Sequence, residues 1–207
     1  MNILVVASTS FEIAPFIEQN PKASVLITGI GMPASLYQIQ KTIGINNYDI
    51  IIQAGIAGAF TNEFELGETV LVKQDTFGDI GIEEKQQFTP IFETDLLNKN
   101  EFPFKNGWLF NDNKILQQSN LELVKAITVN KVNDNLLLKE QLMELFNPEI
   151  ETMEGAALHY VCLQEKTPFV QIRSISNYVG ERDKTKWKME LAIKNLNTEL
   201  EKLISEL

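Results

Sequence analysis

The sequence predicts an α/β fold in which a mixed, largely parallel β-sheet is flanked by helices. Short apolar runs alternate with helical patterns along the chain, and no repeat or low-complexity tract interrupts them. The 207 residues are 44% hydrophobic, which suits one full core. The 11 glycines and 7 prolines are spread along the chain and mark no clear linker. We therefore expect a single domain over residues 1–207.

Six strands are predicted from apolar runs of strand length. Runs such as NILVVA and YDIIIQAG are apolar at most positions, which is typical of strands that are buried or half-buried. Strands that alternate with helices favour parallel pairing, because a helix carries the chain back across the sheet. In chain order, the strands are expected at 2–7, 24–28, 48–55, 68–74, 126–130 and 169–176.

Four helices are predicted between and after these strands. The last one carries apolar residues at helical spacing from Met189 to Ile204, so one of its faces should pack on the core. Residues 76–120 are irregular and rich in Phe, Asn and Gln, which indicates loops and short strands rather than a second domain. The helices are expected near 33–43, 133–146, 154–165 and 186–206.

Composition and charge exclude several classes of function. Lys and Arg total 18 against 28 Asp and Glu, and a net charge of −10 would repel nucleic acid. The first residues form a strand-like run without a basic leader, and no apolar stretch approaches the roughly 20 residues of a membrane span. A single cysteine allows no internal disulfide and no thiolate metal cluster. We expect a cytoplasmic protein without a metal or a membrane partner.

The segment TGIGMPA fits the G-x-G-x-x-A pattern of dinucleotide-binding proteins, and Asp49 follows Gly29 at the matching distance. Two details oppose a nicotinamide cofactor. The pattern follows the second strand rather than the first, and Asp49 opens the next strand instead of closing it. We therefore predict that the glycines allow a tight turn against a smaller ligand.

Few side chains remain for acid–base chemistry. His159 is the only histidine and lies inside the apolar run GAALHYVCLQ, so we predict a packed, hydrogen-bonded histidine; Cys162 in the same run should be a small buried hydrophobe. Carboxylates are left. Glu12 follows the first strand, and Glu154 stands where an extended piece turns into a helix. Alone, each is equally well explained as a helix-terminal acid.

Taken together, these segments resemble the nucleoside phosphorylase and nucleosidase superfamily over nearly the whole chain. The similar segments are ASTSFE, TGIGMPAS, QAGIAGAF, ETMEGAA and VQIRSISN. Within that superfamily, NYVGERDKTKW most resembles the futalosine hydrolases, which remove hypoxanthine from futalosine on the alternative menaquinone route. The resemblance implies a partly barrel-like sheet, a purine nucleoside substrate, no cofactor, and a homodimer or higher homo-oligomer.

The resemblance also implies roles for individual residues. Glu12 would be the general base that activates water, and Glu154 would hold the ribose hydroxyls. Met153 would pack on the ribose face. Arg173 would pair with a site carboxylate and the water, although a purely structural ion pair is an equal alternative. The base-side residues implied in the same way are Ile56, Ala57, Gly58 and Val132.

Asn177 is the residue that points to a particular base. Nucleosidases that act on adenine have Asp at this position, which accepts from the 6-amino group. A 6-oxopurine presents the acceptor O6 instead, and an amide can donate to O6 while it accepts from N7–H. An Asp would leave a buried mismatch of roughly 1–3 kcal/mol. Asn177 therefore predicts recognition of hypoxanthine.

By the same resemblance, water is the expected nucleophile. Phosphorylases of the superfamily hold phosphate with Arg and Ser, where this chain has Gln53 and Ile56, neither of which neutralises a dianion. For the carboxylate of futalosine, the candidate cations are Arg182, Lys184 and Lys186. Three alternatives stay open: a methylthioadenosine/S-adenosylhomocysteine or aminofutalosine nucleosidase, a purine nucleoside phosphorylase, and a non-catalytic nucleoside-binding protein.

Overall fold

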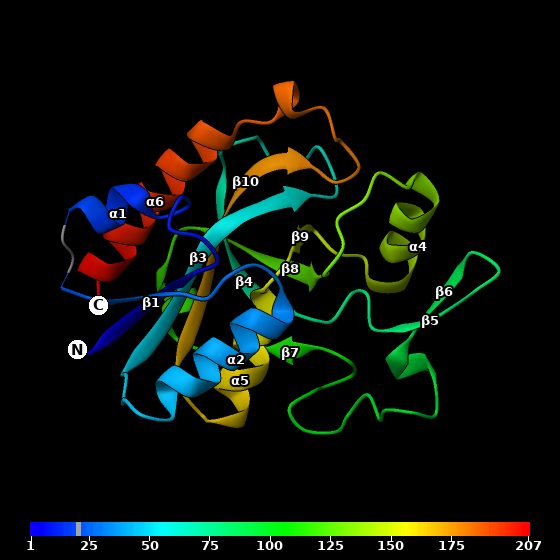
Figure 1. The fold of residues 1–207 in the computed structure, drawn as a ribbon, viewed down its shortest axis with the longest axis horizontal. Coiled ribbons are helices and arrows are strands. Elements are labelled where there is room, and N and C mark those ends of the chain that lie inside the picture. Colours follow the sequence, from blue (N-terminus) through cyan, green and yellow to red (C-terminus); the bar gives the residue numbers. More distant parts are fainter. Residues whose placement is uncertain (20–21) are drawn as a thin grey trace.

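The structure is a computed structural model that describes residues 1–19 and 22–207. Its main sheet has the strand order β10-β4-β8-β9-β3-β1-β2, and β7 pairs with β4. A further pairing of β3 with β10 closes β3, β10, β4, β8 and β9 into a barrel, from which β1 and β2 extend (Figure 1). This confirms the mixed, partly barrel-like sheet. The strands are β1 Ile3–Ala7, β2 Ser24–Ile27, β3 Ile50–Ala59, β4 Thr69–Asp75, β7 Leu109–Phe110, β8 Glu122–Thr128, β9 Ile150–Thr152 and β10 Phe169–Tyr178.

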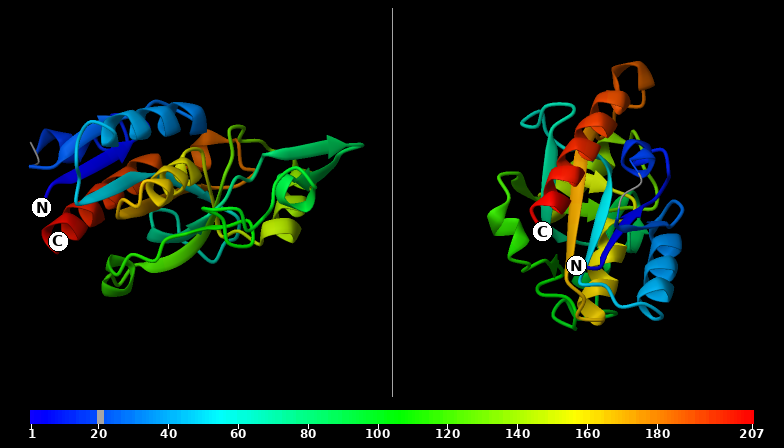
Figure 2. Two further views of the ribbon diagram at one scale, coloured as in Figure 1. Left: turned by 90° about the horizontal axis from the view of Figure 1, so that it is seen from below. Right: turned by 90° about the vertical axis from the view of Figure 1, so that its left-hand side faces the viewer.

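Helices cover both faces of the extended part of the sheet. Helices α1 and α6 lie on one side of β1 and β3, and α2 and α5 lie on the other (Figures 1 and 2). Alternate residues of β1 enter different cores, since Val5 packs with Leu200 of α6 and Val6 packs with Ile39 of α2. The strand is therefore buried on both faces, as its continuous apolar run predicts. The helices are α1 Ala14–Glu18, α2 Met32–Ile43, α3 Ile115–Gln118, α4 Leu136–Phe146, α5 Gly155–Gln164 and α6 Met189–Ser205.

The middle of the chain consists of loops and short elements, as predicted. The hairpin of β5 Gly81–Glu84 and β6 Gln87–Pro90 projects from the barrel, and a 3₁₀ turn follows it at Ile91–Glu93 (Figure 2). Another 3₁₀ turn, Lys184–Lys186, precedes α6. None of the helices in the described ranges combines the length and the apolar character that a membrane crossing requires.

Several element boundaries differ from the sequence prediction, and the structure gives a cause for two of them. Helix α4 begins only at Leu136 because the Asn135 side chain caps it, accepting from the backbone N–H groups of Leu137 and Leu138. Strand β3 continues through its glycines to Ala59, because β10 and β9 pair with this segment on either side. The prediction missed α1 and β9, which are too short to show a periodic pattern.

The glycine turn and Asp49 lie at opposite ends of the sheet. Gly29 and Gly31 have positive φ angles of 85° and 90° and lead the chain from β2 into α2. Asp49 immediately precedes β3, where its carboxylate accepts from the backbone N–H of Asn2 at 2.6 Å. This separation agrees with the view that the glycines serve a tight turn and that Asp49 does not belong to the same site.

Candidate active site

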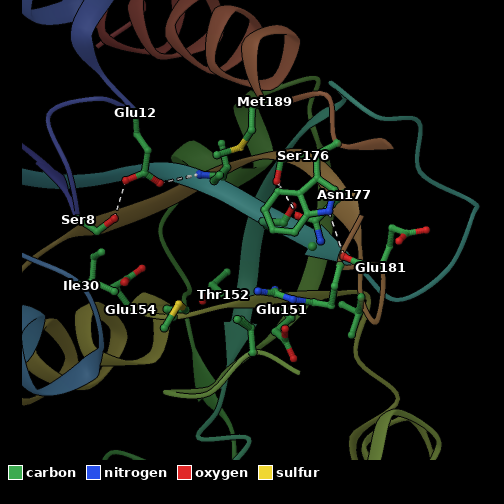
Figure 3. A pocket seen from close by; sticks show the side chains of 18 of the residues that line it. Ser8, Glu12, Ile30, Glu151, Thr152, Glu154, Ser176, Asn177, Glu181 and Met189 are labelled. Carbon is green, nitrogen blue, oxygen red and sulfur yellow. Dashed lines mark hydrogen bonds between the residues drawn. The ribbon is translucent and has the colours of Figure 1, made fainter. Parts of the chain in front are cut away.

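A pocket of about 310 Å³ lies where five strands end. Most of its walls come from residues at or just after the carboxyl ends of β1, β3, β8, β9 and β10, and the remainder from Ile30 after β2 and from the segment at the start of α6. Figure 3 shows two groups of polar side chains in it, with Glu12 and Glu154 toward one end and Asn177 and Glu151 toward the other. Pockets of this size and mixed lining are typical of small-molecule sites.

Glu12 is held as a hydrogen-bond acceptor from several directions. One carboxylate oxygen accepts from the Ser8 hydroxyl and from both the N–H and the hydroxyl of Thr9, at 3.2 and 2.9 Å for Thr9. The other oxygen accepts from the backbone N–H of Ile56 at 3.2 Å. Only 7% of Glu12 is exposed, and helix α1 begins after it, so Glu12 is not a first-turn acid of that helix. Its carboxylate is instead oriented toward the pocket.

Glu154 stands at the N-cap position of α5 but does not cap this helix. Its carboxylate accepts from the backbone N–H of Gly31 at 2.9 Å, across 123 residues of sequence. This contact joins the glycine turn to the ETMEGAA segment at the pocket wall. Burial raises the pKa of Glu154, and the positive charge of Arg173 partly offsets that effect. The structure therefore does not support the alternative interpretation of Glu154 as a helix cap.

Arg173 lies behind the pocket wall rather than on it. Its side chain is 2% exposed, and Nη2 donates to Gln53 Oε1 at 2.6 Å. A Cβ atom at Gly55 would stand 2.1 Å from Arg173 Nη1 and 3.0 Å from a carboxylate oxygen of Glu12, so only glycine leaves room for both groups. Among the described residues Arg173 forms no ion pair, and the predicted direct pairing with a carboxylate is not observed.

A buried polar network continues from Arg173 away from the pocket. With its amide turned so that the oxygen faces Arg173, the orientation that its neighbours require, Gln171 accepts from Arg173 Nε at 3.1 Å and donates to His159 Nε2 at 2.8 Å and to Asp75 at 3.2 Å. His159 Nδ1 donates to the backbone carbonyl of Leu109 at 3.0 Å. Burial lowers the pKa of His159 to about 4, so the ring is neutral at ordinary pH. His159 is thus the packed, hydrogen-bonded histidine that the sequence predicts.

Cys162 is also placed as predicted. It is buried in the apolar cluster between α5, α2 and β1, and burial raises the pKa of its thiol. A protonated, inaccessible thiol is inert, so neither Cys162 nor His159 contributes to the pocket chemistry.

Asp75 makes the stability of the fold depend on pH. Burial raises its pKa to about 7 from 3.8, against hydrogen bonds from Thr128 and Thr76. Between these two values the unfolded chain has released the proton and the folded chain still holds it, so stability falls as pH rises. Asp75→Asn cannot titrate at this position, so it serves as the reference. Between about pH 5 and pH 7.5, we expect the wild type to lose about 2 kcal/mol more free energy of unfolding than Asp75→Asn does.

Chemical denaturation of both proteins at the two pH values measures this difference. A constant offset between them is expected from the altered contact with Gln171, so only the change with pH is informative. Asp112→Asn, at an exposed carboxylate that pairs with Lys105, serves as the matched control. Parallel stability curves for the wild type and Asp75→Asn would contradict the assignment.

Asn177 faces the pocket with half of its hydrogen-bonding capacity free. Its Oδ1 accepts from the Ser176 hydroxyl at 2.8 Å, and its Nδ2 donates to the backbone carbonyl of Tyr178 at 3.2 Å. Because a carbonyl only accepts, the Tyr178 contact fixes which side of the amide carries nitrogen. A β-bulge between Ile175 and Asn177 aligns Asn177 with Gly58 of β3. One N–H and one lone pair of Asn177 remain for a ligand.

Most of the other predicted site residues also line this pocket. Arg182 does so as well, and its guanidinium lies 5.5 Å from the centre of the Trp187 ring. Lys184 and Lys186 do not line it, and Lys186 pairs with Glu181 at 2.6 Å. The predicted residues that line the pocket are Glu12, Ile56, Ala57, Gly58, Val132, Met153, Glu154 and Asn177.

The sequence interpretation missed Glu151. This residue lies on β9, is buried, and lines the same pocket. The sequence did contain a signal for Glu151. Carboxylates are rarely buried, and Glu151 stands in the stretch EIETMEGAA directly before a buried helix. Other lining residues were also missed, among them the apolar side chains of Phe11, Ile30, Trp187 and Met189.

Comparisons with known proteins agree with this architecture. A futalosine hydrolase from Thermus thermophilus is 27% identical over 98% of this chain and 95% of its own length. A 5′-methylthioadenosine/S-adenosylhomocysteine nucleosidase from Colwellia psychrerythraea is 27% identical over 76% of this chain and 67% of its own length. The solved structure of such a nucleosidase from Helicobacter pylori covers all of this chain and 99% of its own, with a TM-score of 0.83 at 17% identity.

The family comparison covers nearly the entire sequence. Residues 7–206 match the family described as the phosphorylase superfamily. That range begins at the last residue of β1 and contains the other strands that contribute to the pocket and every site residue discussed above. The chain therefore belongs to the phosphorylase superfamily.

Proposed function

We propose that this chain is a nucleosidase that hydrolyses the N-ribosidic bond of futalosine and releases hypoxanthine. The similarity to futalosine hydrolases and to methylthioadenosine nucleosidases supports an N-glycosyl hydrolase. Both kinds of relative match the chain, so the choice of substrate rests on the pocket itself. The observation that carries this choice is the amide of Asn177, whose nitrogen side is set by the Tyr178 carbonyl.

The amide suits a 6-oxopurine in both of its free positions. The second N–H of Asn177 Nδ2 donates to O6, and the second lone pair of Oδ1 accepts from N7–H once the departing base has gained a proton at N7. As the C1′–N9 bond breaks, its electron pair passes to the base, and the donor at O6 stabilises the charge that develops there. Asn177 has no proton to give, so the proton that the base gains comes from water.

The opposite end of the pocket supplies the nucleophile. Glu12 orients a water molecule and takes its proton as the oxygen attacks C1′ of the sugar. Glu154 accepts hydrogen bonds from the ribose hydroxyls, and its negative charge favours the positive charge that develops on the ring. The Ile56 N–H positions Glu12, and Asn177 is aligned with Gly58 two residues further along β3. That spacing of roughly 7 Å suits the separation of a sugar from the outer edge of its base.

The surroundings of Glu12 support water rather than phosphate as the nucleophile. Gln53 is buried and already engaged, accepting from Arg173 at 2.6 Å and donating to the Glu154 carbonyl at 3.4 Å. Ile56 offers no side-chain donor, and Arg173 lies behind the wall. A phosphate in this region would meet the Glu12 carboxylate without a facing cation.

A substrate panel tests the proposal. Futalosine, aminofutalosine, methylthioadenosine and inosine are each incubated with the protein, with and without phosphate, and the released base is separated by chromatography. We expect hypoxanthine from futalosine at the highest kcat/KM, a rate indifferent to phosphate, and free sugar rather than a sugar phosphate. A sugar 1-phosphate would indicate a phosphorylase, and preferential release of adenine would indicate a nucleosidase of the methylthioadenosine type. No base release at all would indicate a binding protein.

A further inference from the structure

Glu151 is a buried carboxylate in the pocket that the mechanism above does not use. Only 7% of the residue is exposed, and its Oε2 atom has no hydrogen-bond partner in the part of the chain that the structure describes. Glu151 takes part in no ion pair among the described residues. Burial raises its pKa to about 7, and nearby charges modify this effect, with Asp79 raising the pKa and Arg182 and Lys139 lowering it. An acceptor left without a donor at such a position is costly unless a ligand supplies one.

The strand register places Glu151 opposite Asn177. Glu151 pairs with Gly58 across β9 and β3, and Gly58 pairs with Asn177 across β3 and β10. Directly paired residues place their side chains on the same face of a sheet. The absent side chain of Gly58 leaves space between the two outer residues, since a Cβ there would stand 3.3 Å from Asn177 Nδ2. Two strand spacings separate Glu151 from Asn177 by roughly 10 Å.

We propose that Glu151 is a second base-reading residue, which accepts a hydrogen bond from N1–H of a 6-oxopurine while Asn177 reads the O6 and N7 edge. The proposal rests on the proposed function, because it assumes that the base is hypoxanthine. N1 and N7 lie on either side of C6, so their partners approach the ring from well-separated directions. A six-membered ring between Glu151 and Asn177 would lie over Gly58, with one hydrogen-bonding partner on each side.

In its ionised form, above its pKa of about 7, the same carboxylate discriminates against adenine. Hypoxanthine carries a hydrogen on N1, whereas the N1 of adenine is an acceptor and would face Glu151 with like polarity. A hydrogen bond from N1–H to a carboxylate is charge-assisted and therefore stronger than one between neutral groups. Glu151 and Asn177 thus select the same base through two different atoms.

Binding of free bases tests this role directly. Isothermal calorimetry at about pH 8, where Glu151 is mostly ionised, compares hypoxanthine, 1-methylhypoxanthine and adenine with the wild type, Glu151→Gln and Glu151→Leu. We expect the wild type to bind hypoxanthine at least about tenfold more tightly than either other base. In Glu151→Leu, the affinity for hypoxanthine should fall by about 10- to 100-fold. Hypoxanthine and 1-methylhypoxanthine should then bind to this variant with similar affinity. In Glu151→Gln, the amide can donate to N1 of adenine, so the preference for hypoxanthine over adenine should shrink.

A substitution just before this strand controls for the loss of a negative charge in this part of the chain. Glu149→Gln removes a carboxylate that accepts from the backbone N–H of Lys125 and does not line the pocket, so base preference should be unchanged. Thermal unfolding confirms that each variant is folded. If Glu151 instead only balances the charge of Arg182, the affinities for hypoxanthine and for adenine would fall by the same factor in Glu151→Leu. That result would overturn the proposal.

The outcome separates this proposal from the proposed function. A wild type that prefers hypoxanthine, with the same preference in both Glu151 variants, contradicts the role of Glu151 alone. A wild type that binds adenine in preference to hypoxanthine contradicts the choice of futalosine, whatever the variants do. Because free bases carry no sugar, neither result depends on recognition of the 5′ substituent.

Discussion

Replacement of Glu12 by glutamine is expected to lower kcat for futalosine by at least about 100-fold, the scale of general base catalysis. Glutamine keeps the length of the side chain but cannot take the proton of the attacking water. Substrate affinity should change far less, because Glu12 acts on the water rather than on the nucleoside. Steady-state kinetics of the purified variant, with hypoxanthine release as the signal, measure both quantities.

Two further variants make this test specific. Glu12→Asp keeps the charge but withdraws the carboxylate from the water, so its turnover should lie between those of the wild type and Glu12→Gln. Glu18→Gln, at an exposed residue of the adjoining helix, should behave as the wild type. Glutamine presents an N–H group to one of the donors around Glu12, so thermal unfolding must show a folded variant. Near-normal turnover in a folded Glu12→Gln protein would remove Glu12 from the role of base.

Replacement of Asn177 by aspartate is expected to move the preference between futalosine and aminofutalosine by about tenfold to a hundredfold, or roughly 1–3 kcal/mol. The carboxylate loses the N–H that donates to O6, so futalosine cleavage should fall. It gains an acceptor for a 6-amino group, and a protonated form can supply N7, so aminofutalosine cleavage should rise or fall less. The ratio of kcat/KM for the two substrates, in the variant and in the wild type, measures the shift.

A second amide-to-acid change separates hydrogen bonding from charge. Asn133 lines the same pocket, and Asn133→Asp introduces the same negative charge without touching Asn177. In this variant, kcat/KM should change by similar factors for futalosine and aminofutalosine, so the ratio of the two kcat/KM values should stay unchanged. The Tyr178 carbonyl would face an oxygen in Asn177→Asp, which costs stability, so the two variants are compared at a temperature where both are folded. An equal ratio in all three proteins would mean that Asn177 does not read the base.

The sequence by itself determined the elements of the fold and the region of the site. Strands with continuous apolar runs and helices with a clear period were predicted within a few residues, because burial on both faces or on one stripe leaves a pattern in the chain. The resemblance of ASTSFE and VQIRSISN to segments of the nucleosidase superfamily predicted that Glu12 and Asn177 share a pocket. The structure places both in it.

Only the tertiary structure decided how these residues are used. Glu154 accepts from Gly31, which lies 123 residues away in the chain, and no local pattern distinguishes that contact from a helix cap. The space that Gly55 leaves for Arg173 likewise depends on packing between strands. The pairing of Glu151 with Gly58 depends on the register of β9, a strand of three residues that carries no periodic signal. The local pattern of apolar residues indicates which face of a strand or helix is buried. The hydrogen-bond partners of a side chain depend on contacts between segments that are distant in the sequence.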